Sequence, residues 1–262
     1  MNKKTWMWII FGALFPPLFA FPLIYYFFYR PLKDGIIGGS HIRFYFWGSL
    51  ITSLSLLAGL PIRNLSKTFL ILNNPLNAQI YIFTSFGLAI LSIILLFVSI
   101  RNEPDKKQFL PIHKFKPDQL FLFCLLLSLF PLLSIIFGKT INLDQISHPF
   151  GYAIAVVFKN KSYFVVAIGF LVISITSAIL EESFFRGILF RDYFKLGIFG
   201  QRSLLLLTAL YFAICHIPIS FVSLLIFALF VNRVRLAYNN LLPTIILHAL
   251  WNASVTIAVL LR

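Results

Sequence analysis

The chain has 262 residues, of which 60% are hydrophobic and 11% are charged. Soluble domains carry roughly 45–50% apolar and about 25% charged residues, so this composition excludes an ordinary soluble domain and indicates an integral membrane protein. The net charge of +14 is scattered through short segments between apolar runs, which is typical of loops beside anionic lipid headgroups and argues against a nucleic-acid-binding face.

Eight apolar runs approach the roughly 20 residues that a membrane-spanning helix needs. In chain order they cover residues 6–29, 44–60, 78–100, 120–137, 163–180, 203–217, 219–234 and 241–261. The first run is longer than the apolar part of a signal peptide, so we interpret it as a retained span. The sixth and seventh are short, as expected for helices around a recessed site. The sequence therefore predicts an all-α bundle of about eight spans, with a conical polar cavity formed by the C-terminal helices.

A proline-containing connection predicts two groups of spans. It separates three spans within residues 1–118 from five within residues 119–262. With eight spans both chain ends lie on one side, which holds eight of the 22 Lys and Arg, while the other side holds the remaining 14. Because positive charge is enriched in cytoplasmic loops, the connections after odd-numbered spans are predicted to be cytoplasmic. We expect a multi-pass plasma-membrane protein whose active site faces the cytoplasm.

Two adjacent acidic residues, Glu181 and Glu182, directly follow the apolar run 163–180. Burying one acidic side chain at the centre of a membrane helix costs about 2.5–3.5 kcal/mol, so ionisable groups within membrane segments indicate function. Glu182 precedes Arg186 by four residues, the favourable orientation for an ion pair on a helix. Glu181 faces about 100° away on a helix and is predicted to have a separate task. The alternative is that both are helix-end charges at the headgroup boundary.

Three further polar residues interrupt the apolar C-terminal segments. His216 lies in the sixth run, and His248 and Asn252 lie four residues apart on one face of the last. A single membrane histidine is equally well explained as a structural hydrogen-bonding group. Because each C-terminal segment contributes at least one polar group, we expect these groups to converge on one site.

Water activation by a carboxylate suits this set of residues. Glu181, aided by His216, is placed to take a proton from a water that attacks a peptide carbonyl. His248 and Asn252 are suited to donate hydrogen bonds to the developing oxyanion. Arg186 is predicted to hold Glu182, and through it the end of the helix.

Metal and covalent chemistry are the alternatives. A zinc site of Glu181, His216 and His248 remains open, although no His-Glu-x-x-His spacing is present. Ser183 and Cys215 are possible nucleophiles, but neither has a histidine at helical spacing, so covalent catalysis is disfavoured. We predict no cofactor.

The ordered polar residues resemble the three motifs of the CPBP family, the CAAX-protease and bacteriocin-processing group also called Abi proteins. The family patterns Glu-Glu-x-x-x-Arg, Phe-x-x-x-His and His-x-x-x-Asn match Glu181–Arg186, Phe212–His216 and His248–Asn252. The resemblance covers roughly residues 163–261. It implies an all-helical glutamic intramembrane endopeptidase in which Glu181 and His216 activate water and His248 and Asn252 form the oxyanion site. One departure is the stretch 226–235, where many relatives have several small residues and this chain has only Ala228.

The leading hypothesis is an intramembrane endopeptidase that cleaves membrane-associated proteins or peptides, with the anionic bilayer surface as its surroundings and no nucleic-acid partner. A non-catalytic immunity or scaffold protein would keep the same helices without needing an oxyanion pair. An ion-coupled transporter is a third hypothesis, because buried Glu, Arg and His also mark ion pathways. No inverted repeat in the sequence supports transport.

Overall fold

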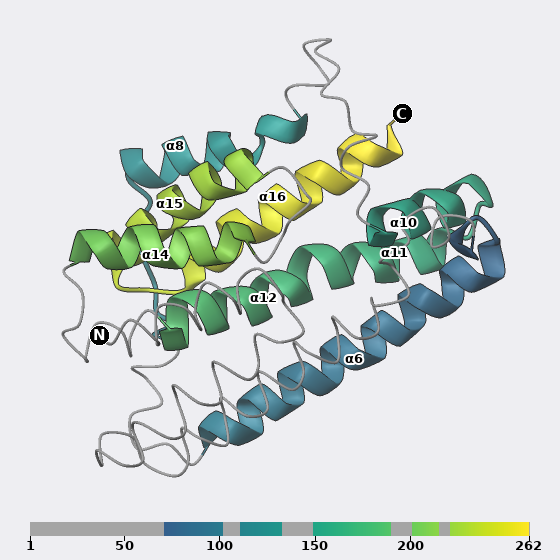
Figure 1. The fold of residues 1–262 in the computed structure, drawn as a ribbon, viewed down its shortest axis with the longest axis horizontal. Coiled ribbons are helices and arrows are strands. Elements are labelled where there is room, and N and C mark those ends of the chain that lie inside the picture. Colours follow the sequence, from purple (N-terminus) through teal and green to yellow (C-terminus); the bar gives the residue numbers. More distant parts are fainter. Residues whose placement is uncertain (1–70, 102–110, 133–148, 190–200, 215–220, 262) are drawn as a thin grey trace, which may run out of the picture. The chain divides into compact units, whose positions relative to one another are not determined.

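The computed structural model of the chain describes residues 71–101, 111–132, 149–189, 201–214 and 221–261, drawn as ribbons in Figure 1. Over these ranges the chain forms helices, turns and short irregular segments, without a β-strand. This confirms the predicted all-α class for the described part. The predicted spans at residues 6–29 and 44–60 lie outside the described residues.

Eight α-helices and two π-helical segments make up the described part. They are α6 (Pro75–Arg101), α8 (Gln119–Ser128), α10 (Pro149–Lys159), α11 (Tyr163–Leu171), η5 (Val172–Thr176), α12 (Ser177–Glu182), η6 (Ser183–Leu189), α14 (Gln201–Ile214), α15 (Phe221–Tyr238) and α16 (Leu242–Leu260). Of these, α10 and η6 were not predicted as parts of spans; α10 has only 11 residues, too few to cross a bilayer, and η6 lies beyond the predicted end of the fifth span.

The chain divides into two compact units. One comprises Met1–Asn64 and Leu91–Lys106, of which the structure describes only the C-terminal part of α6. The other comprises Leu65–Ile90 and Lys107–Arg262 and contains the whole predicted site. The rest of this description concerns the second unit.

Two helical stretches of the described part are long and apolar enough to cross a membrane, Tyr163–Gly187 and Phe221–Tyr238. Together with the composition, they identify a membrane protein. The first stretch is a single helical path through α11, η5, α12 and η6, and it continues beyond the predicted end at Leu180. Glu181 and Glu182 therefore lie inside a helix. This corrects the alternative in which the pair marks a helix end.

Apolar side chains pack α6, α10 and α11 together. Their buried core includes Ile82 of α6, Ile154 of α10 and Val165 of α11. Gly169 of α11 permits this close packing, because a Cβ atom there would lie 2.9 Å from Cγ1 of Ile154. Adding even a methyl group at this position would force the Ile154 side chain or the helix backbone to shift.

A second core joins α8, α15 and α16 through residues that include Phe121, Val234 and Leu247. At one end of these helices, a buried asparagine between α15 and α16 fixes the segment that precedes α8. Asn240 donates from its side-chain amide to the carbonyl of His113 (2.6 Å), and its Oδ1 accepts from the backbone N–H of His113 (3.4 Å). α16 also packs against η5 and α12, which brings His248 beside the acidic pair.

Candidate active site

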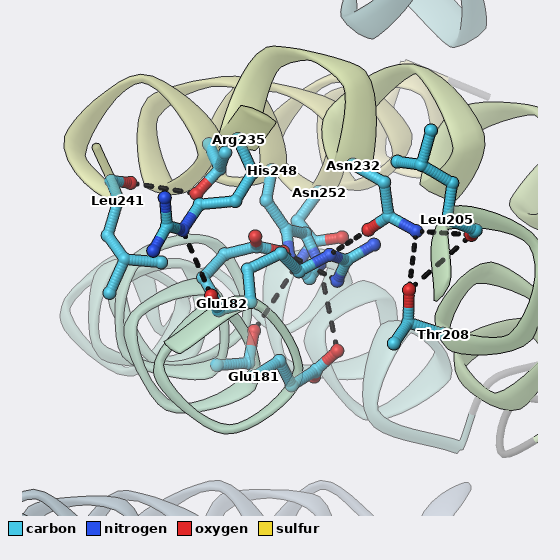
Figure 2. Close-up of polar contacts among 12 residues, drawn as sticks. Glu181, Glu182, Leu205, Thr208, Asn232, Arg235, Leu241, His248 and Asn252 are labelled. Carbon is cyan, nitrogen blue, oxygen red and sulfur yellow. Dashed lines mark hydrogen bonds and ion pairs between the residues drawn. The ribbon is translucent and has the colours of Figure 1, made fainter. Parts of the chain in front are cut away.

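Glu182 is the central anion of a buried polar cluster. Its side chain has no exposed surface, and its Oε1 accepts hydrogen bonds from Nη1 of Arg186 at 2.9 Å and from Nδ1 of His248 at 2.8 Å (Figure 2). The ion pair with Arg186, one helical turn away, confirms the pairing predicted from the sequence. One carboxylate oxygen therefore has two hydrogen-bonding neighbours, a guanidinium from its own helix and an imidazole from α16.

His248 lies between the two carboxylates. Its Nδ1 binds Glu182, while its Nε2 lies 3.7 Å from Oε2 of Glu181. Phe212 of α14 and Phe227 of α15 meet the imidazole edge to face, with ring centroids 5.6 and 5.8 Å away. Because the two aromatic rings leave the imidazole little room to rotate, Nδ1 remains directed at Glu182 and Nε2 at Glu181.

Glu181 differs from its neighbour in exposure. Its side chain is 29% exposed, whereas that of Glu182 is fully buried. The 100° rotation between consecutive helical residues accounts for the difference, because it turns the two carboxylates in different directions. Of the two, Glu181 has the more exposed side chain, although its Oε2, the oxygen that faces His248, is itself buried.

Arg186 is held from three sides. Besides its bond to Glu182, its Nε donates to Oδ1 of Asn232 at 2.9 Å, and its guanidinium carbon lies 4.5 Å above the ring centroid of Phe212. The side chain is completely buried. An arginine stacked on an aromatic ring and bonded at two nitrogens has essentially one orientation.

Asn232 extends this network to α14. Its side-chain amide donates to the carbonyl of Leu205 and to the hydroxyl of Thr208, both at 2.8 Å. Asn232 is fully buried in α15. Arg235, one turn beyond, donates from Nε to the carbonyl of Arg186 at 3.0 Å.

Asn252 is anchored to the helix that carries the acidic pair. Its amide donates to the carbonyl of Ile173 at 2.9 Å and to Oγ of Ser177 at 3.2 Å, and the hydroxyl of Ser177 donates to the same carbonyl. Ile173 lies in the π-helical segment η5. A π-helical turn changes the regular hydrogen-bonding ladder and leaves carbonyls available to side chains, which explains why an amide can dock there.

Four of the six predicted site residues form one cluster, namely Glu181, Glu182, Arg186 and His248. Asn252 lies one turn from His248 on α16 and contacts η5 and α12. His216 lies outside the described residues, as does Cys215. No group of three potential metal ligands occurs among the residues that the structure describes. The zinc alternative includes His216 and therefore stays a hypothesis.

Two supporting residues, Asn232 and Arg235, were not predicted from the sequence. They lie in the stretch 226–235, which had been considered only for its shortage of small residues. The available signal was the presence of an amide and a guanidinium within an apolar membrane segment, the same signal that singled out the acidic pair. Arg235 lies beyond the predicted end of the span at residue 234, whereas α15 continues to Tyr238. Asn232 lies inside the predicted span, where this signal was present but was not used.

The arrangement is suited to proton transfer. Oε1 of Glu182 already accepts from Arg186, so Nδ1 of His248 is assigned as the donor in their hydrogen bond. The Nε2 then faces Glu181, the more exposed carboxylate. An imidazole between two carboxylates, as His248 lies between Glu182 and Glu181, can accept and pass on protons in general acid–base catalysis.

Comparison with known families identifies the C-terminal region. Residues 163–254 match the family model described as "Type II CAAX prenyl endopeptidase Rce1-like". The match begins at the first residue of α11 and includes all three motifs, and it confirms the predicted resemblance to the CPBP family. No curated protein and no solved structure matches the chain.

Proposed function

We propose, from the premise that residues 163–254 are an Rce1-like domain of a protease family, that this protein is an intramembrane endopeptidase. Its substrates would be membrane-associated proteins or peptides, cleaved as in CAAX-type proteolysis. The observation that carries the proposal is the different setting of the adjacent glutamates: one is buried and paired, and the other is partly exposed beside an imidazole. Two carboxylates with separate environments are expected where one has a structural and the other a chemical task.

Glu181 is the proposed general base. Together with His216, it would take a proton from a water molecule as that water attacks the peptide carbonyl. The partial exposure of Glu181 supports this role, because the base must reach both water and substrate. Glu182 and Arg186 would be the supporting pair, since both are buried and neutralise each other.

His248 and Asn252 would stabilise the oxyanion. To donate to the oxyanion, His248 would have to carry a proton on Nε2 as well as on Nδ1, and Nε2 points toward Glu181, on the side where the reacting carbonyl would have to lie. Asn252 would have to release one amide hydrogen, and the 3.2 Å bond to Ser177 is the longer of its two bonds. Donors aimed at a developing oxyanion often make the largest contribution to catalysis, with roughly 10²–10³ in kcat for a single donor.

The proposed setting is a bundle of about eight spans in the plasma membrane, with a polar cavity formed by the C-terminal helices. The cavity would open toward the cytoplasm, in accord with the distribution of Lys and Arg. The basic loops would lie against anionic headgroups, and no cofactor would be required.

The test compares cells that express the wild type with cells that express Glu181→Gln. Membrane proteins are then searched by proteomics for chains that are shortened only in the presence of the wild type. Identical profiles would reject proteolysis in favour of a non-catalytic immunity or scaffold protein. In vitro, a quenched peptide with a farnesylated CAAX end and the same peptide without the lipid establish whether the prenyl group is recognised.

A further inference from the structure

Asn232 is the least expected polar residue of the described C-terminal helices. It lies fully buried in α15, directly after the apolar residues 224–231. An amide left unpaired in such a place would be strongly destabilising. Its side chain forms hydrogen bonds with three polar groups of two other elements, Arg186 in η6 and Leu205 and Thr208 in α14.

The partners of Asn232 determine which way its amide points. The carbonyl of Leu205 can only accept, so the –NH₂ group must face it, and Nε of Arg186 can only donate, so Oδ1 must face that atom. The distances of 2.8 and 2.9 Å agree with this assignment. A flipped amide would lose both bonds. Asn232 is therefore a fixed acceptor aimed at Arg186.

The contacts form one continuous chain of hydrogen bonds. Thr208 of α14 accepts from Asn232, which accepts from Arg186; Figure 2 shows Thr208 and Asn232 in the same view as the acidic pair. Arg186 in turn donates to Oε1 of Glu182, the same atom that His248 binds. The chain runs from α14 through α15 and the acidic helix to α16, and it ends at the imidazole that faces Glu181.

We propose that Asn232, supported by Thr208, is a positioning residue that sets the orientation of His248 through Arg186 and Glu182. Asn232 itself touches neither the reacting atoms nor His248. The proposal rests on the proposed function for its catalytic consequence, but the orientation of the imidazole can be measured without activity. Without Asn232, Nε of Arg186 loses its acceptor, so the guanidinium is no longer held in one orientation. Glu182 then loses a fixed donor, and His248 loses a fixed carboxylate.

The experiment measures the ring ¹⁵N chemical shifts of histidines in the full-length, detergent-solubilised protein. The chain has 5 histidines, and the spectrum of His248→Gln identifies the signals of His248 by their absence. Asn232→Leu should shift both ring signals of His248, because ring nitrogen shifts report tautomer and hydrogen bonding. The matched control is Asn240→Leu, which also removes a buried asparagine but one bonded to His113.

A second pair of variants covers the case in which Asn232→Leu does not fold. Thr208→Val removes the hydroxyl that accepts from Asn232, whereas Thr208→Ser retains it. We expect Thr208→Val to move the His248 signals in the same direction and Thr208→Ser to restore them. If the His248 signals of every folded variant coincide with those of the wild type, Asn232 has only a packing role and the proposal is wrong.

Kinetics separate this inference from the proposed function. With a farnesylated CAAX peptide as substrate, Asn232→Leu should lower kcat about 100-fold and leave KM nearly unchanged, since a small misplacement of a catalytic group has an effect of this order. A lower kcat with unmoved His248 signals, or an effect only on KM, would contradict the positioning role. If the wild type cleaves neither the peptide nor a cellular protein, the proposed function fails while the ring signals still decide whether Asn232 orients His248.

Discussion

Nδ1 of His248 lies 2.8 Å from Oε1 of Glu182, although 66 residues separate them in the chain. The first and third motifs are thus joined directly inside the helical bundle. The same oxygen also binds Arg186 at 2.9 Å. Glu182 therefore has two partners at the centre of the site. It forms a buried ion pair with Arg186 and a hydrogen bond that fixes the imidazole of His248.

Replacement of Glu182 by Gln should destabilise the protein strongly. Arg186 would remain buried without an anion at its Nη1, and loss of one partner of a buried ion pair typically costs about 3–5 kcal/mol. Thermal unfolding in detergent measures the effect. Glu181→Gln is the matched control, because Glu181 is partly exposed; it should abolish cleavage with little change in Tm. Equal losses of Tm in the two variants would contradict the division of roles.

Removal of the Asn252 amide should loosen the contact between α16 and η5. Asn252→Ala loses the bonds to Ile173 and Ser177, and two such hydrogen bonds together contribute about 1–3 kcal/mol to stability. Thr256→Val is the control on the same helix, since the hydroxyl of Thr256 bonds back to the carbonyl of Asn252 within α16. The midpoint of thermal unfolding should fall more for Asn252→Ala, and a fall of equal size in both variants would disprove the anchor.

Alanine at position 169 should weaken the packing of α11 against α10. The new Cβ would lie 2.9 Å from Cγ1 and 3.2 Å from Cδ1 of Ile154, and overpacking of this kind costs about 1–3 kcal/mol. At Gly87 in α6 nothing lies within 4 Å of the added atom, so Gly87→Ala should be neutral or stabilising by up to about 1 kcal/mol. Ile154→Ala should partly restore Gly169→Ala, as a double-mutant cycle would reveal.

The start of α8 should lose stability in acid. Asp118 caps this helix, and the hydroxyl of Tyr238, followed by the N–H of Phe121, holds the pKa of the Asp118 carboxyl below its usual value. A lowered folded-state pKa means that the contribution is complete above the unfolded pKa of about 3.9 and is lost as pH falls further through the folded-state pKa. Tyr238→Phe should therefore lower Tm at pH 6 and have less effect near pH 3.

Asp118→Asn provides the control for this pH dependence, because it removes the titrating group. In that background, the effect of Tyr238→Phe on Tm should not vary between pH 6 and pH 3. If the effect of Tyr238→Phe in the wild-type background is the same at both pH values, Asp118 is not the responsible group.

Chelation separates activated water from zinc chemistry. We expect purified, active protein to keep its cleavage rate after treatment with EDTA or 1,10-phenanthroline, because Glu181 and His216 are proposed to activate water without a metal. Abolished activity that added zinc restores would instead favour the set Glu181, His216 and His248. Metal analysis of the purified protein provides the second measurement, since a structural or catalytic zinc would be present near one equivalent.

The membrane class, the helical fold and the pairing of Glu182 with Arg186 were accessible from the sequence. Each depends on local properties, namely the length of apolar runs and the spacing of residues on one helix. The bounds of α14, α15 and α16 agree with the predicted runs to within a few residues. Helix α10 and the continuation of the acidic helix to Leu189 were missed, because apolarity marks where a helix crosses lipid rather than where it ends.

The sequence by itself determined the residue types of the site and the order of its three motifs. Only the tertiary structure decided how they are joined: that His248 turns one nitrogen to each glutamate, that Asn252 docks on η5, and that Asn232 holds Arg186. These contacts link residues from different helices, whose relative rotation depends on the packing of many apolar side chains at once. No spacing along one helix contains that information.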